Sequence, residues 1–450
     1  MKAASETQHV AVLAFPFGTH SVPLLNIIQR ITSNSPQVIF SFFSTATNIA
    51  GIDASIFLNL PNVKPYNVDD GLPADYVPSG HPLERIHFFI RAMPENYRRS
   101  MELAVAERGR KITCIVTDAF LWFGAEMAEQ MRAKWVPIWM AGPHSLLTHV
   151  VTDLLRQKFP CDDDACREQS LSFLLNLSSV KVKDLPEGIL REIDEPFAVM
   201  IHKAGQMLPK ATAVAINSYD TILHPIVNDL KSKFRMLLNI GPLALTTPQP
   251  VIPDKQGCLQ WLDKQKTASV VYIGFGSVIL PPPHELSALA QALEEGKFLF
   301  IWSFRGNAEK QLPEGFLKRT EEQGIVVPWA PQLDILKHES IAAFMTHCGW
   351  NSIMESIVGG VPMICRPFFG DQRLNTLMLE GEWGVAMAVE NGVITKNEIK
   401  RVLESSLSGE KGKIMRSNIG SLRQSALEAV DEACGSSAQN FRTLIELVTA

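Results

Sequence analysis

Residues with the greatest density of reactive and binding groups lie between Trp329 and Gln372. This stretch combines aromatic, small polar, acidic and amide side chains, which can stack on a base, bind phosphate and bond sugar hydroxyls. The apolar run Ile341 to Met345 predicts a buried strand. Gly359 and Gly360 are expected to end the helix that follows, and Pro362 to Cys365 to form the next strand. The order predicts a β-α-β unit with a right-handed crossover.

The start of this helix is a candidate phosphate site. We expect Asn351 or Ser352 to begin it, with Glu355 three residues after Ser352 as in a capping box. His347 and Trp350 then lie at the same end, after a parallel strand. Free N–H groups and the positive end of the helix dipole hold phosphate at such a place.

Further side chains complete a nucleotide-sugar site. Glu355 is one helical turn from Asn351 and can accept hydrogen bonds from ribose hydroxyls. Asp371 and Gln372 follow the next strand and can bond sugar hydroxyls, and Trp329 offers a flat ring for a base. Each residue alone is more often a helix cap, a core aromatic or a surface acid. Their combination predicts a site for a nucleotide sugar.

The first half of the chain carries a candidate acid–base pair. His20 follows the first expected strand, and Asp118 ends a later expected strand of the same sheet. Both should lie at the ligand-binding end of that sheet. A histidine oriented by a carboxylate is a good general base. His20 considered alone is more often an ordinary loop histidine.

The alternation of short apolar strands and amphipathic helices predicts an α/β fold of the doubly wound type, in two similar halves. Ala213 to Asn217 is expected to be the last strand of the first half. The expected segments are a first domain at 1–240, a proline-rich linker at 241–253, a second domain at 254–430, and a C-terminal helix at 431–450 that packs back on the first domain.

The composition is that of an ordinary soluble globular protein. The 450 residues are 46% hydrophobic and 20% charged, with a formal net charge of −5, so neither nucleic acid nor an anionic membrane is an expected partner. Seven cysteines without a Cys-x-x-Cys pair argue against a disulfide framework and a zinc site. No apolar run approaches the roughly 20 residues of a membrane span. We expect a cytosolic protein.

The stretch from Trp329 to Gln372 resembles the signature box of plant family 1 UDP-sugar glycosyltransferases. The segments HVAVLAFPFGTH, VTDAFLWFGAEMA, NSYD and NIGPL, and VPMICRPFFGDQ at the end of the box, are similar to the flavonoid 3-O-glucosyltransferase branch of that family. The resemblance covers essentially the whole chain. The recurring residues of the box are present as Trp329, Gln332, His347, Gly349, Trp350, Asn351, Ser352, Glu355, Asp371 and Gln372.

The resemblance implies the GT-B architecture, in which two Rossmann-like domains face each other across a cleft. The first domain would bind the acceptor and the second the UDP-sugar. Trp329 would stack on uracil and Glu355 would bind the ribose. The expected diphosphate contacts are His347, Asn351, Ser352 and Ser277; the expected sugar contacts are Trp350, Asp371 and Gln372; and Ala330 and Gln332 complete the donor set.

The resemblance also implies the reaction. His20 and Asp118 would form the catalytic dyad of an inverting transfer of glucose from UDP-glucose to the 3-hydroxyl of a flavonol or anthocyanidin. The helix start would stabilise the departing diphosphate, so neither a metal nor a cofactor is expected. The expected partners are small molecules only, and the expected state is a monomer.

The acceptor site is expected to be apolar and aromatic. Its candidate residues are Phe17, Gly18, Leu83, Phe120, Met140, His149 and Phe369. Met140 stands where relatives often have Thr, and Leu83 where they often have Gln. Gln372 favours glucose. The open alternatives are galactose or rhamnose as the sugar, a broader range of phenols, and a catalytically silent UDP-sugar-binding protein.

Overall fold

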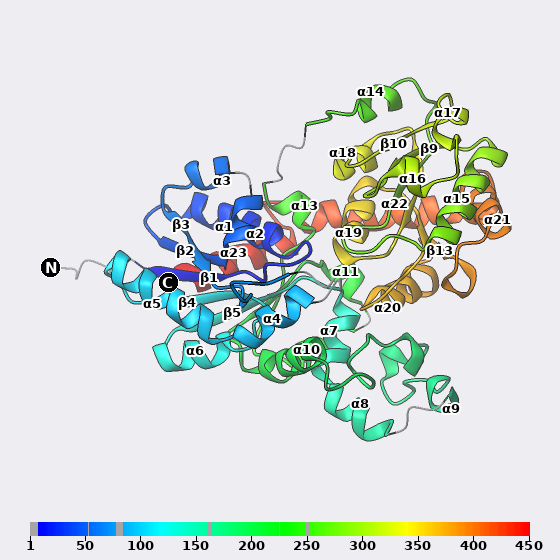
Figure 1. Ribbon diagram of the computed structural model, residues 1–450. Coiled ribbons are helices and arrows are strands. Elements are labelled where there is room, and N and C mark those ends of the chain that lie inside the picture. Colours follow the sequence, from blue (N-terminus) through cyan, green and yellow to red (C-terminus); the bar gives the residue numbers. More distant parts are fainter. Residues whose placement is uncertain (1–7, 53, 78–83, 161–163, 225, 249–252) are drawn as a thin grey trace. The chain divides into compact units, whose positions relative to one another are not determined.

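The computed structural model describes residues 8–52, 54–77, 84–160, 164–224, 226–248 and 253–450 (Figure 1). The chain forms two compact units. Unit 1 comprises Met1–Lys183, Glu187–Pro248 and Asp431–Ala450, and unit 2 comprises Asp184–Pro186 and Gln249–Val430.

Unit 1 is built on a seven-stranded sheet in the order β3-β2-β1-β4-β5-β6-β7. All its strand pairs are parallel, and the order reverses between β1 and β4, the switch point at which such sheets bind ligands. The strands are β1 His9–Leu13, β2 Ile39–Thr45, β3 Val63–Val68, β4 Cys114–Asp118, β5 Lys134–Trp139, β6 Val214–Ile216 and β7 Leu237–Asn239.

Continuous burial explains why the central strands could be predicted. All five residues of both β1 and β4 are buried, as expected of strands covered on both faces. Several helices contact the strands of this sheet. The helices of unit 1 are α1 Ser21–Asn34, α2 Ala46–Gly51, α3 Ala54–Leu58, α4 Glu84–Ala92, α5 Glu95–Arg108, α6 Gly124–Met131, α7 Pro143–Val150, α8 Thr152–Lys158, α9 Asp164–Arg167, α10 Pro196–Met207, α11 Asp220–Leu223, α12 Val227–Lys231, α13 Leu243–Thr246 and α23 Ser436–Thr449.

The C-terminal helix α23, red in Figure 1, belongs to unit 1 and packs on β7, β4 and β5. Its apolar face contributes Phe441, Leu444 and Val448 to the core of that unit. The guanidinium of Arg30 lies 4.1 Å from the centre of the Phe441 ring. The last 15 residues are therefore held by apolar burial and by this cation–π contact.

Unit 2 repeats the plan with a six-stranded parallel sheet in the order β10-β9-β8-β11-β12-β13. Its order reverses between β8 and β11, which gives this sheet a switch point of its own. The strands are β8 Val270–Gly274, β9 Leu299–Ser303, β10 Gly324–Val327, β11 Ile341–Thr346, β12 Met363–Cys365 and β13 Ala386–Ala388.

Helices again cover the sheet of unit 2. The expected stop of α19 is confirmed, since Gly360 caps it at φ 75°, a left-handed conformation that glycine adopts without strain. The helices are α14 Cys258–Leu262, α15 Pro283–Gly296, α16 Ala308–Gln311, α17 Phe316–Arg319, α18 Gln332–Lys337, α19 Trp350–Gly359, α20 Gln372–Leu377, α21 Lys396–Leu407 and α22 Glu410–Ala429.

Two local predictions are wrong. Helix α19 begins at Trp350, with Gly349 as its N-cap and no side-chain cap, so there is no capping box from Ser352 to Glu355. Ala213 to Asn217 is not the last strand of the first half, because β7 follows it. Strand β7 has only three residues, and the last, Asn239, is polar and donates to Asp220, so the apolar run there is confined to residues 236–238.

Among the described residues, no helix is long and apolar enough to cross a membrane.

Candidate active site

The structure brings His20 and Asp118 together at the switch point of unit 1. His20 caps the start of α1, just after β1, and Asp118 is the last residue of the neighbouring strand β4. His20 Nδ1 lies 2.7 Å from Asp118 Oδ2. The side chain of Asp118 is 1% exposed, whereas that of His20 is 22% exposed. The carboxylate is therefore fixed inside while the imidazole can reach a ligand.

The contacts of Asp118 determine which nitrogen of His20 is the base. Asp118 Oδ1 accepts a hydrogen bond of 2.9 Å from the backbone N–H of Phe120, which holds the carboxylate in place. A carboxylate only accepts, so His20 Nδ1 must donate to it. In the neutral ring Nε2 is then the acceptor, as a general base requires.

Aromatic rings surround the dyad and form apolar walls. The ring centre of His20 lies 4.8 Å from that of Phe120 and 5.4 Å from that of Phe15. Phe17 and Phe89 extend this cluster, with ring centres 5.5 Å apart. Such surfaces suit a flat, apolar phenol rather than a charged or highly polar substrate.

A hollow of about 340 Å³ opens beside the loop that carries His20, within the size range of small-molecule sites. Two predicted acceptor residues, Phe17 and Gly18, line it. Gly18 has φ 62°, a conformation that glycine favours. The other lining residues are Pro16, Ser21, Val22, Thr45, Thr47, Asn48, Gly51, Ile52 and Arg85.

The other residues predicted for the acceptor site lie in different parts of the structure. Phe120 contacts His20, as above. Met140 is 7% exposed and belongs to the hydrophobic core of unit 1. Phe369 is exposed and belongs to unit 2. Leu83 lies outside the described residues.

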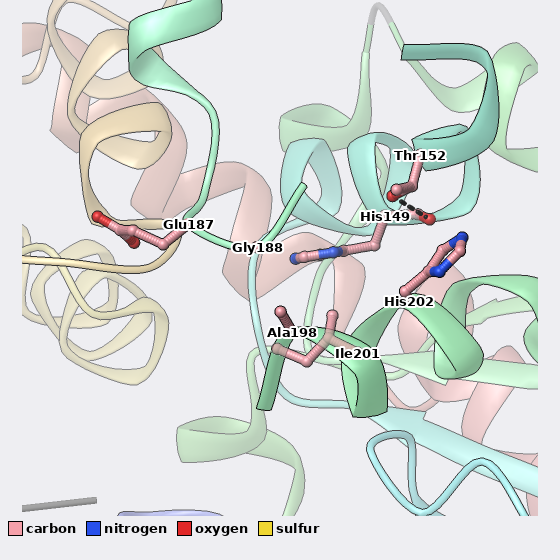
Figure 2. A pocket seen from close by; sticks show the side chains of 7 residues that line it. All are labelled: His149, Thr152, Glu187, Gly188, Ala198, Ile201 and His202. Carbon is pink, nitrogen blue, oxygen red and sulfur yellow. Dashed lines mark hydrogen bonds between the residues drawn. The ribbon is translucent and has the colours of Figure 1, made fainter. Parts of the chain in front are cut away.

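His149 lies on α7 and lines a small pocket together with residues of α8 and α10 (Figure 2). Its imidazole points toward Gly188, and its backbone oxygen accepts a hydrogen bond of 2.9 Å from Thr152. The side chain is buried, and burial, with a further contribution from the charge of His202, lowers the pKa of His149 to about 3. The ring is therefore neutral near pH 7.

The burial of His149 predicts a loss of stability in acid. The unfolded chain takes up this proton near pH 6.5, whereas the folded chain does so only near pH 3. The free energy of unfolding should therefore decrease as the pH falls below 6.5, by up to about 1.4 kcal/mol per pH unit from this group. Urea unfolding between pH 7.5 and 4.5 measures how the free energy of unfolding changes with pH. His149→Gln should reduce this slope by the contribution of one proton, up to about 1.4 kcal/mol per pH unit. An unchanged slope in that variant would show that His149 is not the cause.

In unit 2, the loops after β8 and β11 meet at the switch point around His347. A Cβ on Gly276 would lie 2.7 Å from His347 Nε2, and one on Gly349 would lie 2.4 Å from the same atom. Only glycine at both positions leaves room for the ring. His347 Nδ1 is buried and has no hydrogen-bond partner among the described residues, and burial lowers the pKa of His347 to about 4. The site thus holds a neutral imidazole with a nitrogen free for a ligand. Ser277, another predicted diphosphate contact, directly follows Gly276 in the chain and is exposed.

A hydrogen-bond network links α18 to α19. Gln332 Nε2 lies 2.5 Å from Glu355 Oε2 and 3.0 Å from Ser352 Oγ. Burial raises the pKa of Glu355, and the hydrogen bond from Gln332 opposes that rise. Gln332 therefore favours the ionised carboxylate, the form that accepts hydrogen bonds from hydroxyl groups.

Asp371 and Gln372 lie at the start of α20. Gln372 Oε1 accepts from the backbone N–H groups of Phe368 and Phe369, at 2.8 and 3.3 Å. Its oxygen is thus used within the protein, which leaves the NH₂ group as the donor for a ligand. Asp371 Oδ2 accepts from Asn375 Nδ2 at 3.0 Å.

The aromatic residues of the box have different environments. Trp329 is 50% exposed, and the guanidinium of Arg305 lies 4.2 Å from its ring centre. Arg305 covers one face of the indole, so the other face can receive a planar base. Trp350 is buried, with its ring centre 6.3 Å from that of Trp383. Ala330 is buried, and Asn351 is partly exposed in the first turn of α19.

Two residues that the sequence analysis missed support this site. Asn375 Nδ2 donates both to Asp371 and to the backbone oxygen of Cys348, at 3.0 Å each, and so links the Asp371 carboxylate to the turn before α19. Asn375 could have been predicted from the sequence, because residues four apart on a helix are neighbours and Asn375 is four residues after Asp371. Arg305 follows β9 at the ligand-binding end of the sheet, the same signal that identified Trp329 after β10.

Truncating Trp329 tests the base-stacking role. Trp329→Ala should weaken UDP binding by about 1–3 kcal/mol, the range for one stacked base. Titration calorimetry with UDP measures this. Trp122→Ala is the matched control, because Trp122 also lies under a cation, Lys203, at 4.5 Å, but in unit 1. Equal UDP affinity in wild type and Trp329→Ala would rule out the stacking role.

No group of three or more His, Cys, Asp or Glu side chains suited to a metal ion occurs in the described part of the chain.

Comparisons with known proteins identify the family. The family model of UDP-glucoronosyl and UDP-glucosyl transferase matches residues 87–425. A flavonoid 3-O-glucosyltransferase of Medicago truncatula is 56% identical, over 98% of this chain and 97% of that protein. The anthocyanidin 3-O-glucosyltransferase of Vitis vinifera is 49% identical, over 100% of this chain and 99% of that protein.

A solved structure agrees with these matches. The crystal structure of a UDP-glucose:anthocyanidin 3-O-glucosyltransferase in complex with UDP has a TM-score of 0.92 and 38% identity, over 98% of this chain and 99% of that one. The predicted fold class, two Rossmann-like units with parallel sheets as in GT-B enzymes, is confirmed. The chain therefore belongs to the UDP-glucoronosyl and UDP-glucosyl transferase family and is a UDP-glycosyltransferase.

Proposed function

We propose that this enzyme transfers glucose from UDP-glucose to the 3-hydroxyl of a flavonol or anthocyanidin, with inversion and without a metal. The observation that supports this most is the 2.7 Å contact of His20 with Asp118 at the switch point, beside an aromatic cluster and a hollow. The relatives named for 3-O-glucosyl transfer to flavonoids and anthocyanidins point to the same acceptor class.

In the proposed reaction, His20 Nε2 takes the proton of the acceptor hydroxyl while Asp118 stabilises the imidazolium that forms. The acceptor oxygen forms a bond to the anomeric carbon on the face opposite the leaving group. The bond between that carbon and the phosphate oxygen breaks, and its electron pair leaves with UDP. The configuration at the anomeric carbon changes from α to β.

In this proposal, unit 2 binds the donor. Trp329 stacks on uracil, Glu355 accepts from the ribose hydroxyls, and Asp371 and Gln372 bond the sugar. The start of α19, with His347 beside it, stabilises the charge that develops on the diphosphate. Unit 1 supplies the base and the acceptor surface, which includes Phe17 and Phe120.

We further propose a cytosolic monomer. The six described cysteines are free thiols, and Cys434 is exposed, as is usual in a reducing compartment.

A matrix of donors and acceptors tests this function. UDP-glucose, UDP-galactose and UDP-rhamnose are each combined with quercetin, kaempferol and cyanidin, and the products are read by mass spectrometry. The proposal expects hexosides in the UDP-glucose row. Products only with UDP-galactose or UDP-rhamnose would overturn the sugar assignment, and no product with any of these acceptors would overturn the acceptor class. UDP binding without any turnover would indicate a silent binding protein.

A further inference from the structure

A buried tyrosine lies directly behind the donor network of unit 2. Tyr272 is in the middle of β8, and its ring stacks on that of Phe344 in β11, with centres 5.0 Å apart and planes at 24°. Its hydroxyl donates to Gln332 Oε1 at 3.2 Å. Burial raises the pKa of Tyr272, so the phenol keeps its proton and remains a donor.

The orientation of the Gln332 amide follows from its partners. The Glu355 carboxylate can only accept, so the NH₂ group of Gln332 must face it, as the 2.5 Å contact of Nε2 with Glu355 Oε2 requires. The amide oxygen then faces Tyr272. The opposite orientation would place the amide oxygen against the carboxylate and its NH₂ group against the phenol O–H.

We propose that Tyr272 is a positioning residue of the donor site, which fixes the Gln332 amide and thereby directs the Glu355 carboxylate toward the ribose of the nucleotide. Tyr272 itself touches no substrate in this account. The inference rests on the proposed function in one respect, since it takes Glu355 as the ribose-binding residue.

The substitution Tyr272→Phe removes one oxygen and keeps the stacked ring. Gln332 then loses the partner of its amide oxygen and is held by these bonds only through its NH₂ group, so it positions Glu355 less firmly. The affinity for UDP should fall by about five- to tenfold, as expected for one lost hydrogen bond that orients a charged group. The affinity for 2′,3′-dideoxy-UDP should stay at the wild-type value, because that ligand has no ribose hydroxyls for Glu355 to bind.

Titration calorimetry of both ligands against the full-length chain measures this difference. Tyr219→Phe is the matched control, since it removes the same atom from a buried tyrosine of unit 1 and should change neither affinity. Thermal unfolding checks that both variants are folded.

Two results would overturn the inference. One is an equal loss for UDP and dideoxy-UDP in Tyr272→Phe, which would mean a general disturbance of unit 2. The other is no loss for either ligand. Because binding is measured rather than turnover, a chain that fails to glucosylate flavonoids would contradict the proposed function and still allow this test.

Discussion

Replacing His20 by alanine is expected to lower kcat for glucosyl transfer by about 10²- to 10⁴-fold, the range for loss of a general base. The affinity for UDP should not change, because the donor network of Gln332, Ser352 and Glu355 lies entirely in unit 2. Steady-state kinetics with UDP-glucose and a flavonol, together with calorimetry of UDP, separate the two effects.

A second histidine–carboxylate pair supplies the control for His20. His338 Nε2 lies 3.2 Å from Asp263 Oδ1 on the surface of unit 2, with a side-chain exposure similar to that of His20. His338→Ala should retain wild-type turnover. Substantial turnover in His20→Ala would show that the base has been wrongly assigned.

The substitution Asp118→Asn is expected to lower kcat by about 10³- to 10⁴-fold without loss of the fold. The backbone N–H of Phe120 would still bond the amide oxygen and so turn the new NH₂ group toward His20 Nδ1. Nδ1 would then accept, and the proton of the neutral ring would move to Nε2. The nitrogen that must take the acceptor proton would already carry one.

The pH profile distinguishes this tautomer effect from simple misfolding. The variant should bind UDP normally and remain slow at every pH at which it is folded. Asp263→Asn, at the surface pair, should behave as wild type. If Asp118→Asn retained more than about a tenth of the wild-type kcat, orientation of His20 by a carboxylate would not be part of the mechanism.

Features that depend on neighbouring residues in the chain could be predicted well. The apolar run of β11 and the glycines that end α19 follow from local patterns, and so does the position of His20 after a buried strand. The contact between His20 and Asp118 was a hypothesis, because sequence spacing does not fix which strands are neighbours. The strand order of unit 1 brings β1 and β4 together and decides it.

Features that depend on contacts between distant elements could not be predicted. The capping box is absent because α19 begins at Trp350, before Ser352, and the Glu355 side chain bonds Gln332 on another helix instead. The positioning role proposed for Tyr272 could not be predicted from the sequence either, since a tyrosine in a buried strand is usually part of the core. The short strand β7 was missed because it pairs only along β6 and carries a polar residue.

The most direct test of the proposed function is the structure of the product formed from UDP-glucose and quercetin, determined by nuclear magnetic resonance. The proposal predicts one main product, the 3-O-glucoside with a β-configured anomeric carbon. An α-linked glucoside would contradict inversion by direct attack, and glucose attached mainly at another hydroxyl would contradict the 3-O assignment.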